Sequence, residues 1–131
     1  MYSRVVLVAL LVLMAVGAEA HSLSPGYKRY DTVYNNLLVH YTLINAYPFP
    51  ASYTVGVYNK DWTPHKEWSV EKATYNLNPT SERPIIIAFT NIQESRKVIV
   101  CTTLTGITHA KKPPKIVSRA CSRLYINYIP S

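Results

Sequence analysis

The N-terminal segment limits how much of this chain is available to fold. Arg4 gives a short positive start, Val5 to Val16 is an apolar run, and Ala18-Glu19-Ala20 has the small-x-small pattern of a signal-peptidase site. The apolar run is too short to cross a bilayer. We therefore expect residues 1–20 to be a signal peptide. Residues 21–131 should form one small secreted domain of about 111 residues, with no membrane insertion after the signal is removed.

Cysteine use fits a secreted domain. Cys101 and Cys121 are the only two cysteines in the chain. Secretion favours a disulfide between them, and two buried free thiols are the alternative. No CxxC or HExxH spacing accompanies the cysteines, so we expect no metal site.

The net charge of +7 is unevenly distributed along the chain. No acidic residue follows Glu94, although many basic ones do. Such one-sided charge suits a polyanion, most simply a nucleic acid, but a solvated face that keeps the protein soluble has the same composition. The candidate contacts to a phosphate backbone are Lys66, Arg96, Lys111, Lys112, Lys115 and Arg119.

The pattern after the signal peptide predicts one helix. Asp31 is a suitable N-cap for a helix over Thr32–Ala46. Consecutive X-Pro steps in Tyr47-Pro48-Phe49-Pro50 end it, because they favour extended backbone. The residues whose spacing fits one apolar helical face are Val33, Leu37, Leu38, Tyr41 and Ile44.

Beyond Pro50 the pattern predicts strands. Gln93-Glu94-Ser95 is the expected turn of a hairpin between Ile85–Phe89 and Val98–Cys101. The segments rich in β-branched and aromatic residues are Tyr53–Tyr58, Arg83–Thr90, Lys97–Thr103 and Leu124–Ile129. One helix followed by antiparallel strands indicates an α+β domain, with the N-terminal helix packed on one face of a twisted antiparallel β-sheet. If the helix does not form, the alternative is an all-β sandwich.

Four short segments resemble the active-site strands of the guanyl-specific ribonucleases of fungi. Pro64-His65-Lys66 resembles the strand with the first catalytic histidine of that family, and Glu82-Arg83-Pro84-Ile85 resembles the strand with its catalytic glutamate. Lys97-Val98-Ile99-Val100 stands in the place of the arginine strand, and Gly106-Ile107-Thr108-His109 resembles the strand with the second histidine. The resemblance implies a ribonuclease-like fold for residues 21–131.

The resemblance also implies a mechanism of RNA cleavage. Glu82, assisted by His65, would take the proton of a ribose 2′-hydroxyl, which attacks the adjacent phosphorus. His109 would protonate the departing oxygen to leave a 2′,3′-cyclic phosphate, and Lys97 would stabilise the phosphoryl charge. Trp68 and Glu71 fall where the family reads guanine. The reaction needs no metal and no cofactor.

Each of these residues also has an ordinary interpretation. His65 is equally typical of an exposed turn, Glu82 of a surface ion pair with Arg83, and His109 of a solvated loop. The chain also departs from the family pattern. Lys97 lacks the bidentate fork of arginine, and Thr63 stands where the family has a tyrosine.

These departures resemble those of the ribonuclease-like effectors that powdery-mildew fungi secrete. We therefore expect a secreted, monomeric effector that binds RNA or a host protein with little or no catalysis, and that acts after delivery into host cells. One alternative is an active guanyl-preferring endoribonuclease that cleaves single-stranded RNA. Another is a small cationic secreted binding protein.

Overall fold

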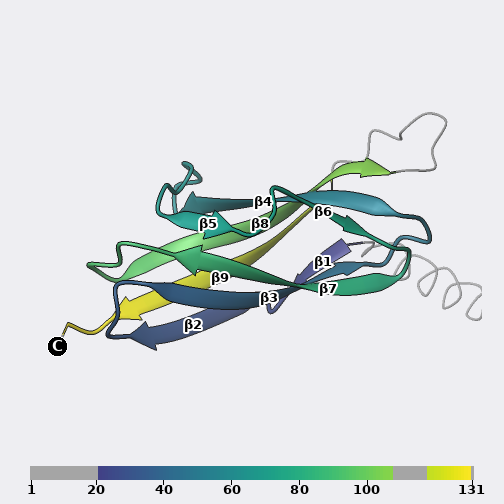
Figure 1. Cartoon of the computed structure of the whole chain (residues 1–131). Coiled ribbons are helices and arrows are strands. Elements are labelled where there is room, and N and C mark those ends of the chain that lie inside the picture. Colours follow the sequence, from purple (N-terminus) through teal and green to yellow (C-terminus); the bar gives the residue numbers. More distant parts are fainter. Residues whose placement is uncertain (1–20, 108–117, 131) are drawn as a thin grey trace, which may run out of the picture.

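The described part of the chain is built entirely from strands. The computed structural model describes residues 21–107 and 118–130, and these contain nine strands and no helix (Figure 1). The strands are β1 (His21–Ser24), β2 (Tyr27–Thr32), β3 (Leu37–Asn45), β4 (Ala51–Asn59), β5 (Trp68–Val70), β6 (Thr74–Leu77), β7 (Ser81–Phe89), β8 (Arg96–Ile107) and β9 (Arg119–Tyr128). No helix able to span a membrane occurs in the described ranges.

The strands form a sandwich of two sheets. One sheet has four strands in the order β1-β3-β7-β5, and the other has five in the order β2-β9-β8-β4-β6. Neighbouring strands are antiparallel except for β2 and β9, which are parallel. The chain changes sheet at Ser24-Pro25, a cis peptide bond: β1 pairs with β3 before it, and β2 pairs with β9 after it.

The core lies between the two sheets and is built mainly from alternate residues of the long strands. On β3 the buried side chains are Val39, Tyr41 and Leu43, and their intervening neighbours face outward. This alternation is the natural period of a strand that has one wet face and one buried face. The other large buried side chains are Tyr53, Val57, Ile85, Ile87, Phe89, Val98, Val100, Leu124 and Ile126.

The predicted helix over Thr32–Ala46 is wrong. Thr32 ends β2, and β3 occupies most of the remaining segment. Two residues of the proposed helical face, Val33 and Leu38, are 49% and 60% exposed. Val39 and Tyr41 are residue types that favour strands, and they follow a period of two. The α+β class is therefore corrected to an all-β sandwich, the alternative that the sequence left open.

The four predicted strands are confirmed in position, but the predicted hairpin is wrong. β7 pairs with β3 and β5, whereas β8 pairs with β4 and β9. Gln93-Glu94-Ser95 therefore lies in a connection that passes from one sheet to the other. Local turn chemistry is the same for a hairpin and for a crossover between sheets, so sequence does not separate them.

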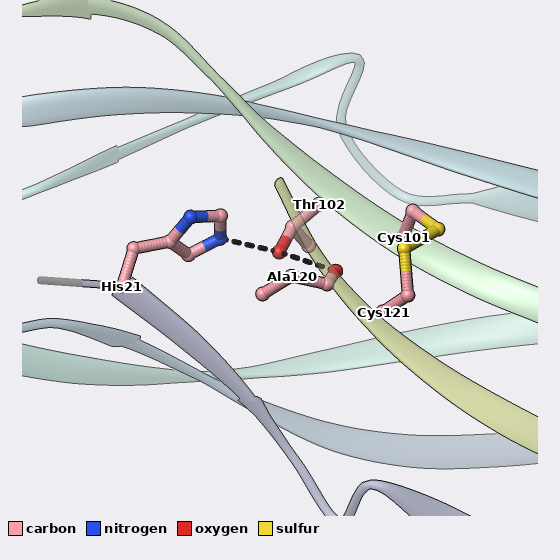
Figure 2. Close-up of a disulfide and its surroundings, with 5 residues drawn as sticks. All are labelled: His21, Cys101, Thr102, Ala120 and Cys121. Atoms are coloured by element: carbon pink, nitrogen blue, oxygen red, sulfur yellow. Dashed lines mark hydrogen bonds between the residues drawn. A yellow bond between two sulfur atoms is a disulfide. The ribbon is translucent and has the colours of Figure 1, made fainter. Parts of the chain in front are cut away.

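The predicted disulfide is confirmed. Cys101 and Cys121 lie directly opposite each other on β8 and β9 with their Cα atoms 4.1 Å apart (Figure 2). The short Cα separation is that of a non-hydrogen-bonded antiparallel pair, in which side chains approach closely. The disulfide ties together the two strands that form the centre of the outer face of the five-stranded sheet.

Candidate functional site

The structure separates the residues that the ribonuclease mechanism needs. Glu82 is exposed on β7 in the four-stranded sheet, and its side chain lies on the face of the strand opposite to that of the core residue Ile85. Lys97 is exposed on β8 in the five-stranded sheet, where Val98 points into the core. Glu82 and Lys97 therefore lie on opposite outer faces of the sandwich and do not converge on one phosphate.

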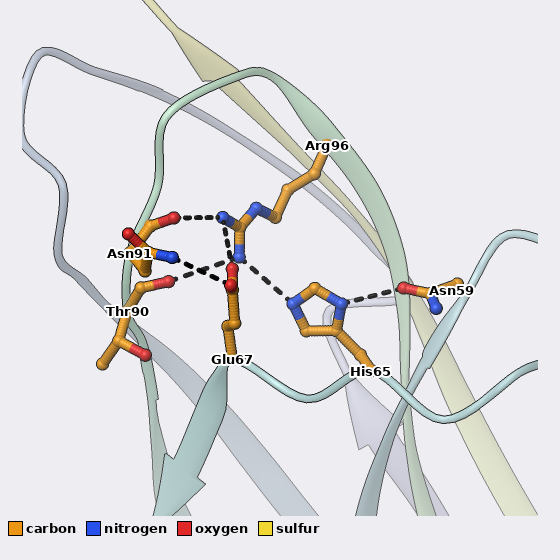
Figure 3. Close-up of polar contacts among 6 residues, drawn as sticks. All are labelled: Asn59, His65, Glu67, Thr90, Asn91 and Arg96. Carbon is orange, nitrogen blue, oxygen red and sulfur yellow. Dashed lines mark hydrogen bonds and ion pairs between the residues drawn. The ribbon is translucent and has the colours of Figure 1, made fainter.

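His65 instead belongs to a polar network between the end of β4 and the start of β8 (Figure 3). Its Nδ1 lies 2.8 Å from Oδ1 of Asn59, and its Nε2 lies 3.1 Å from Nη1 of Arg96. Arginine can only donate, so Nε2 accepts and Nδ1 carries the proton that it donates to Asn59. Burial and then the Arg96 charge lower the pKa of His65, against an opposing effect of Glu67. The imidazole is thus held neutral.

Arg96 is the centre of that network. Its Nη2 donates to Oε2 of Glu67 at 3.2 Å and to the carbonyl oxygen of Asn91 at 2.9 Å. The hydrogen bond from Asn91 and then the Arg96 charge keep the pKa of Glu67 below its usual range. Arg96 was predicted to contact RNA, but its guanidinium is engaged in joining β8 to the segment before β5.

The remaining predicted residues are scattered. Trp68 starts β5, and its indole N–H donates to the carbonyl oxygen of His65 at 2.9 Å, so the ring is tied into the fold. Lys66 and Glu71 are exposed in the connections on either side of β5. Arg119 is exposed at the start of β9. The predicted residues that lie outside the described ones are His109, Lys111, Lys112 and Lys115.

A groove of about 940 Å³ crosses the outer face of the five-stranded sheet. It is lined by residues of β2, β9 and β8 and of the turn that follows β4. Its basic side chains are Arg29, Lys60, Lys97 and Arg123, and no carboxylate is among the described residues that line it. Two exposed rings, Tyr27 and Trp62, also line it.

The strand register explains why basic and aromatic side chains alternate in this groove. Arg29 of β2 is opposite Tyr125 of β9, which is opposite Lys97 of β8. The Arg29 guanidinium carbon lies 5.3 Å and the Lys97 ammonium 5.6 Å from the centroid of the Tyr125 ring. One aromatic ring thus lies within cation–π distance of two cations, one on each neighbouring strand, and attracts both.

A second row lies beside the first. Tyr27 of β2 is opposite Arg123 of β9, Arg123 is opposite Ile99 of β8, and Ile99 is opposite Tyr58 of β4. Since facing positions in a sheet project to the same side, the four side chains form a band across four strands. The band has rings at both ends, a cation, and an apolar side chain between them.

Tyr58 and Arg119 extend the groove toward β4. A Cβ on Gly56 would lie 2.8 Å from the Tyr58 hydroxyl oxygen, so the Tyr58 ring lies over the bare glycine backbone. The Arg119 guanidinium carbon lies 4.7 Å from the Tyr58 ring centroid and 5.5 Å from that of Trp62. Gly56 therefore provides the space that the Tyr58 ring occupies beneath Arg119.

The groove contains residues that the sequence analysis did not select, among them Arg29, Lys60 and Arg123. A signal was available, since Tyr27-x-Arg29 and Arg123-x-Tyr125 both place a ring and a cation two residues apart, on one face of a strand. Within the described ranges, no three side chains of His, Cys, Asp or Glu are arranged to hold a metal ion.

Comparison with solved structures identifies the architecture. The E. coli chaperone DraB is similar with a TM-score of 0.66 and 16% identity, over 82% of this chain and 54% of that one. The chain has a PapD-like fold. It is an immunoglobulin-like sandwich shared with MSP domains.

Further PapD-like structures resemble the chain over most of their length. A PapD-like domain of human CEP192 has a TM-score of 0.62 and 10% identity, over 86% of this chain and 87% of that one. A C. elegans MSP family member has a TM-score of 0.53 and 7% identity, over 84% and 98%. The chain spans about half the length of the pilus chaperones it matches. No family model and no curated protein matches its sequence.

The PapD-like fold overturns the ribonuclease expectation. That expectation required one helix packed on one sheet. It included the ribonuclease-like domain, the resemblance to powdery-mildew effectors, and the effector function of cleaving or binding RNA. The chain instead has two sheets and no helix in its described residues. Short motif matches in similar order were a chance resemblance that a β-rich chain produces readily.

Proposed function

We propose that this chain is a protein-binding domain that recognises an acidic, extended segment of a partner protein through the groove on the outer face of the five-stranded sheet. The observation that carries the proposal is the placement of Arg29, Lys60, Lys97 and Arg123 around one groove with no lining carboxylate. Arg29 also pairs with the nearby Asp31 at 3.3 Å, so Lys60, Lys97 and Arg123 carry most of the argument. Clustered cations repel one another, and an anionic partner relieves that repulsion.

The direction of the groove indicates how such a segment is held. The groove crosses the strands, so a bound segment cannot add to the sheet as a further strand, and side chains must provide the recognition. Adjacent strands lie about 4.8 Å apart, so three steps from β2 to β4 span about 14 Å. An extended peptide of about four residues covers that length.

The chemistry of the groove favours a protein over another polyanion. Ile99 contributes apolar surface, and the rings of Tyr27 and Trp62 are exposed. A peptide can present carboxylates and apolar groups together, whereas a uniformly charged polymer presents one kind of group. Solved proteins of similar fold include a Salmonella enterica chaperone in complex with a pilin. The disulfide supports the further proposal that the domain works in an oxidising compartment, as a secreted protein does.

Fluorescence polarisation with defined peptides tests the proposal. The probes are labelled octapeptides of alternating Glu and Ala, Gln and Ala, or Lys and Ala. We expect only the glutamate peptide to bind, with affinity that falls as salt is raised. The double variant Lys97→Glu/Arg123→Glu should bind it roughly tenfold or more weakly.

The matched control is Lys66→Glu/Lys72→Glu, which makes the same change of net charge at two exposed lysines that do not line the groove. It should bind the glutamate peptide as the unaltered protein does. Equal loss in both double variants would show that only net charge matters. Failure of the glutamate peptide to bind at low salt, with tight binding of a single-stranded RNA, would contradict a protein partner.

A further inference from the structure

Trp62 has a backbone conformation that large residues avoid. Its φ is 69°, in the left-handed region, where a Cβ meets the following carbonyl oxygen. Among the described residues, two other non-glycine residues have positive φ, Thr80 at 48° and Asn91 at 53°. Asparagine tolerates this region, but for a bulky aromatic residue it is a strained position that the surrounding structure must enforce.

The turn that holds Trp62 is fixed by polar contacts that do not involve its ring. The Asn59 N–H donates to the carbonyl oxygen of Thr63 at 2.8 Å, and the Trp62 N–H donates to that of Asn59 at 2.9 Å. The Asp61 carboxylate accepts from the Thr63 hydroxyl at 2.6 Å and from its N–H at 3.2 Å. A glycine at position 62 would make the same turn without strain. The turn therefore does not explain the indole.

Core packing does not explain the indole either. Trp62 is 52% exposed, and its ring neighbours are Tyr58, with centroids 6.0 Å apart, and the guanidinium of Arg119. Both neighbours belong to the outer face of the sheet. The ring thus stands at the side of the groove with much of its surface in water, beside the cations Lys60 and Lys97.

We infer that Trp62 is a specificity-determining residue of the groove: its indole receives an aromatic or other apolar side chain of the bound segment, next to the carboxylates that the cations hold. This inference rests on the proposed function and adds to it a second requirement on the partner. Exposed, rigid aromatic side chains are typical anchors of protein interfaces, and they form their contact surface at low entropic cost. Backbone strain retained at such a position is typical of a functional site.

The test compares two labelled probes built on the alternating Glu-Ala octapeptide. One probe has alanine at both ends, and the other has phenylalanine at both ends. The unaltered protein should bind the phenylalanine probe about fivefold more tightly, the range expected for one aromatic pair. In Trp62→Gly this preference should disappear, so that the two probes bind with equal affinity.

Thermal unfolding separates a recognition role from a structural one. Trp62→Gly removes the ring together with the strain, whereas Trp62→Ala removes the ring and keeps a Cβ in the left-handed region. We expect Trp62→Gly to be the more stable of the two and to unfold within a few degrees of the unaltered protein, while both lose the phenylalanine preference. The control Thr80→Gly relieves a left-handed φ away from the groove and should leave both probes unaffected.

Four outcomes would overturn the inference. The phenylalanine preference could survive in Trp62→Gly, which would assign it to another ring of the groove, such as Tyr27. Trp62→Gly could unfold at a much lower temperature than the unaltered protein, which would make the ring structural. If neither probe bound the unaltered protein, the proposed function and this inference would fail together. If the unaltered protein bound both probes with equal affinity, this inference would be wrong and the proposed function would stand.

Discussion

The imidazole of His21 on β1 lies 2.7 Å from the hydroxyl oxygen of Thr102 on β8, so that a histidine from the four-stranded sheet is bound to the central part of the five-stranded one (Figure 2). Its Nδ1 lies 2.8 Å from the Ser118 hydroxyl. Thr102 can donate to the carbonyl oxygen of Ala120 at 3.5 Å, so Nε2–H donates to Thr102 and Nδ1 accepts from Ser118. The buried ring thus serves as a neutral link between the sheets.

Acid should destabilise the protein through His21. Burial lowers the pKa of His21 from 6.5 to about 4. Above pH 6.5 both the folded and unfolded forms are neutral, and below it the unfolded form gains a proton first. Stability is therefore lost as pH falls from about 6.5 to about 4, on the order of 3 kcal/mol in the free energy of unfolding. Urea denaturation at several pH values measures this loss.

The control for that experiment is a histidine on the surface. His21→Gln should flatten the pH dependence of unfolding, whereas His40→Gln, at an exposed position of β3, should keep it. Equal slopes in the His21→Gln variant and the unaltered protein would show that other groups carry the acid sensitivity. His65, whose pKa is also lowered, contributes in the same direction.

Removing the Arg96 charge should raise the pKa of His65. The guanidinium lies 3.1 Å from Nε2 and disfavours the imidazolium, so Arg96→Leu removes a repulsion from the charged form. NMR titration of the His65 ring resonances measures the change. Lys97→Leu, next in sequence but exposed on the outer face of the sheet, is the matched control and should leave this pKa where it was. An unchanged His65 pKa in Arg96→Leu would contradict the network in Figure 3.

Opening the disulfide should weaken the fold. Cys101 and Cys121 are separated by 20 residues, and the chain-entropy account gives about 3 kcal/mol for closing such a loop. Cys101→Ser/Cys121→Ser should lower the free energy of unfolding by that amount, and urea denaturation measures it as a lower midpoint. A reducing agent should shift the unaltered protein in the same way and leave the double variant unaffected. A reductant effect on the variant would point to a cause other than this bond.

Gly56→Ala should impair the groove more than it impairs the fold. The added methyl would meet the Tyr58 hydroxyl oxygen at 2.8 Å, and the ring must move away, which removes the surface beneath Arg119. We expect a threefold to tenfold weaker affinity for the alternating Glu-Ala peptide, because one cation–π contact is disturbed. Gly106→Ala is the control, since a Cβ there meets nothing within 4 Å. Equal effects of the two substitutions would show that Tyr58 is not part of the binding surface.

Prediction succeeded where the signal was local and failed where it depended on distant partners. Four strands were found because β-branched and aromatic residues prefer extended backbone. The segment now seen as β3 was misjudged because Leu37, Tyr41 and Ile44 fit a helical spacing, although Val39, Tyr41 and Leu43 of the same segment fit the period of a strand. Burial by the opposing sheet decides between the two, and Leu38 is left exposed.

The candidate site could be predicted only in part. Lys97 was selected from the ribonuclease resemblance and Arg119 from charge, and both lie on the outer face that holds the groove. Arg96 was also selected from charge, but it forms an ion pair with Glu67 and does not line the groove. A shift of one position along a strand places a side chain on the other face of the sheet. Trp62 gave no signal in sequence, since its backbone strain exists only in the folded turn.

By itself the sequence determined one disulfide pair, the positions of most long strands and a basic C-terminal half, because these depend on composition and short-range preferences. The tertiary structure decided which strands pair, and therefore that Arg29, Arg123, Lys97 and Lys60 meet around one groove. Those residues come from segments up to about a hundred positions apart. Their proximity follows from strand register between distant segments, which no local pattern specifies.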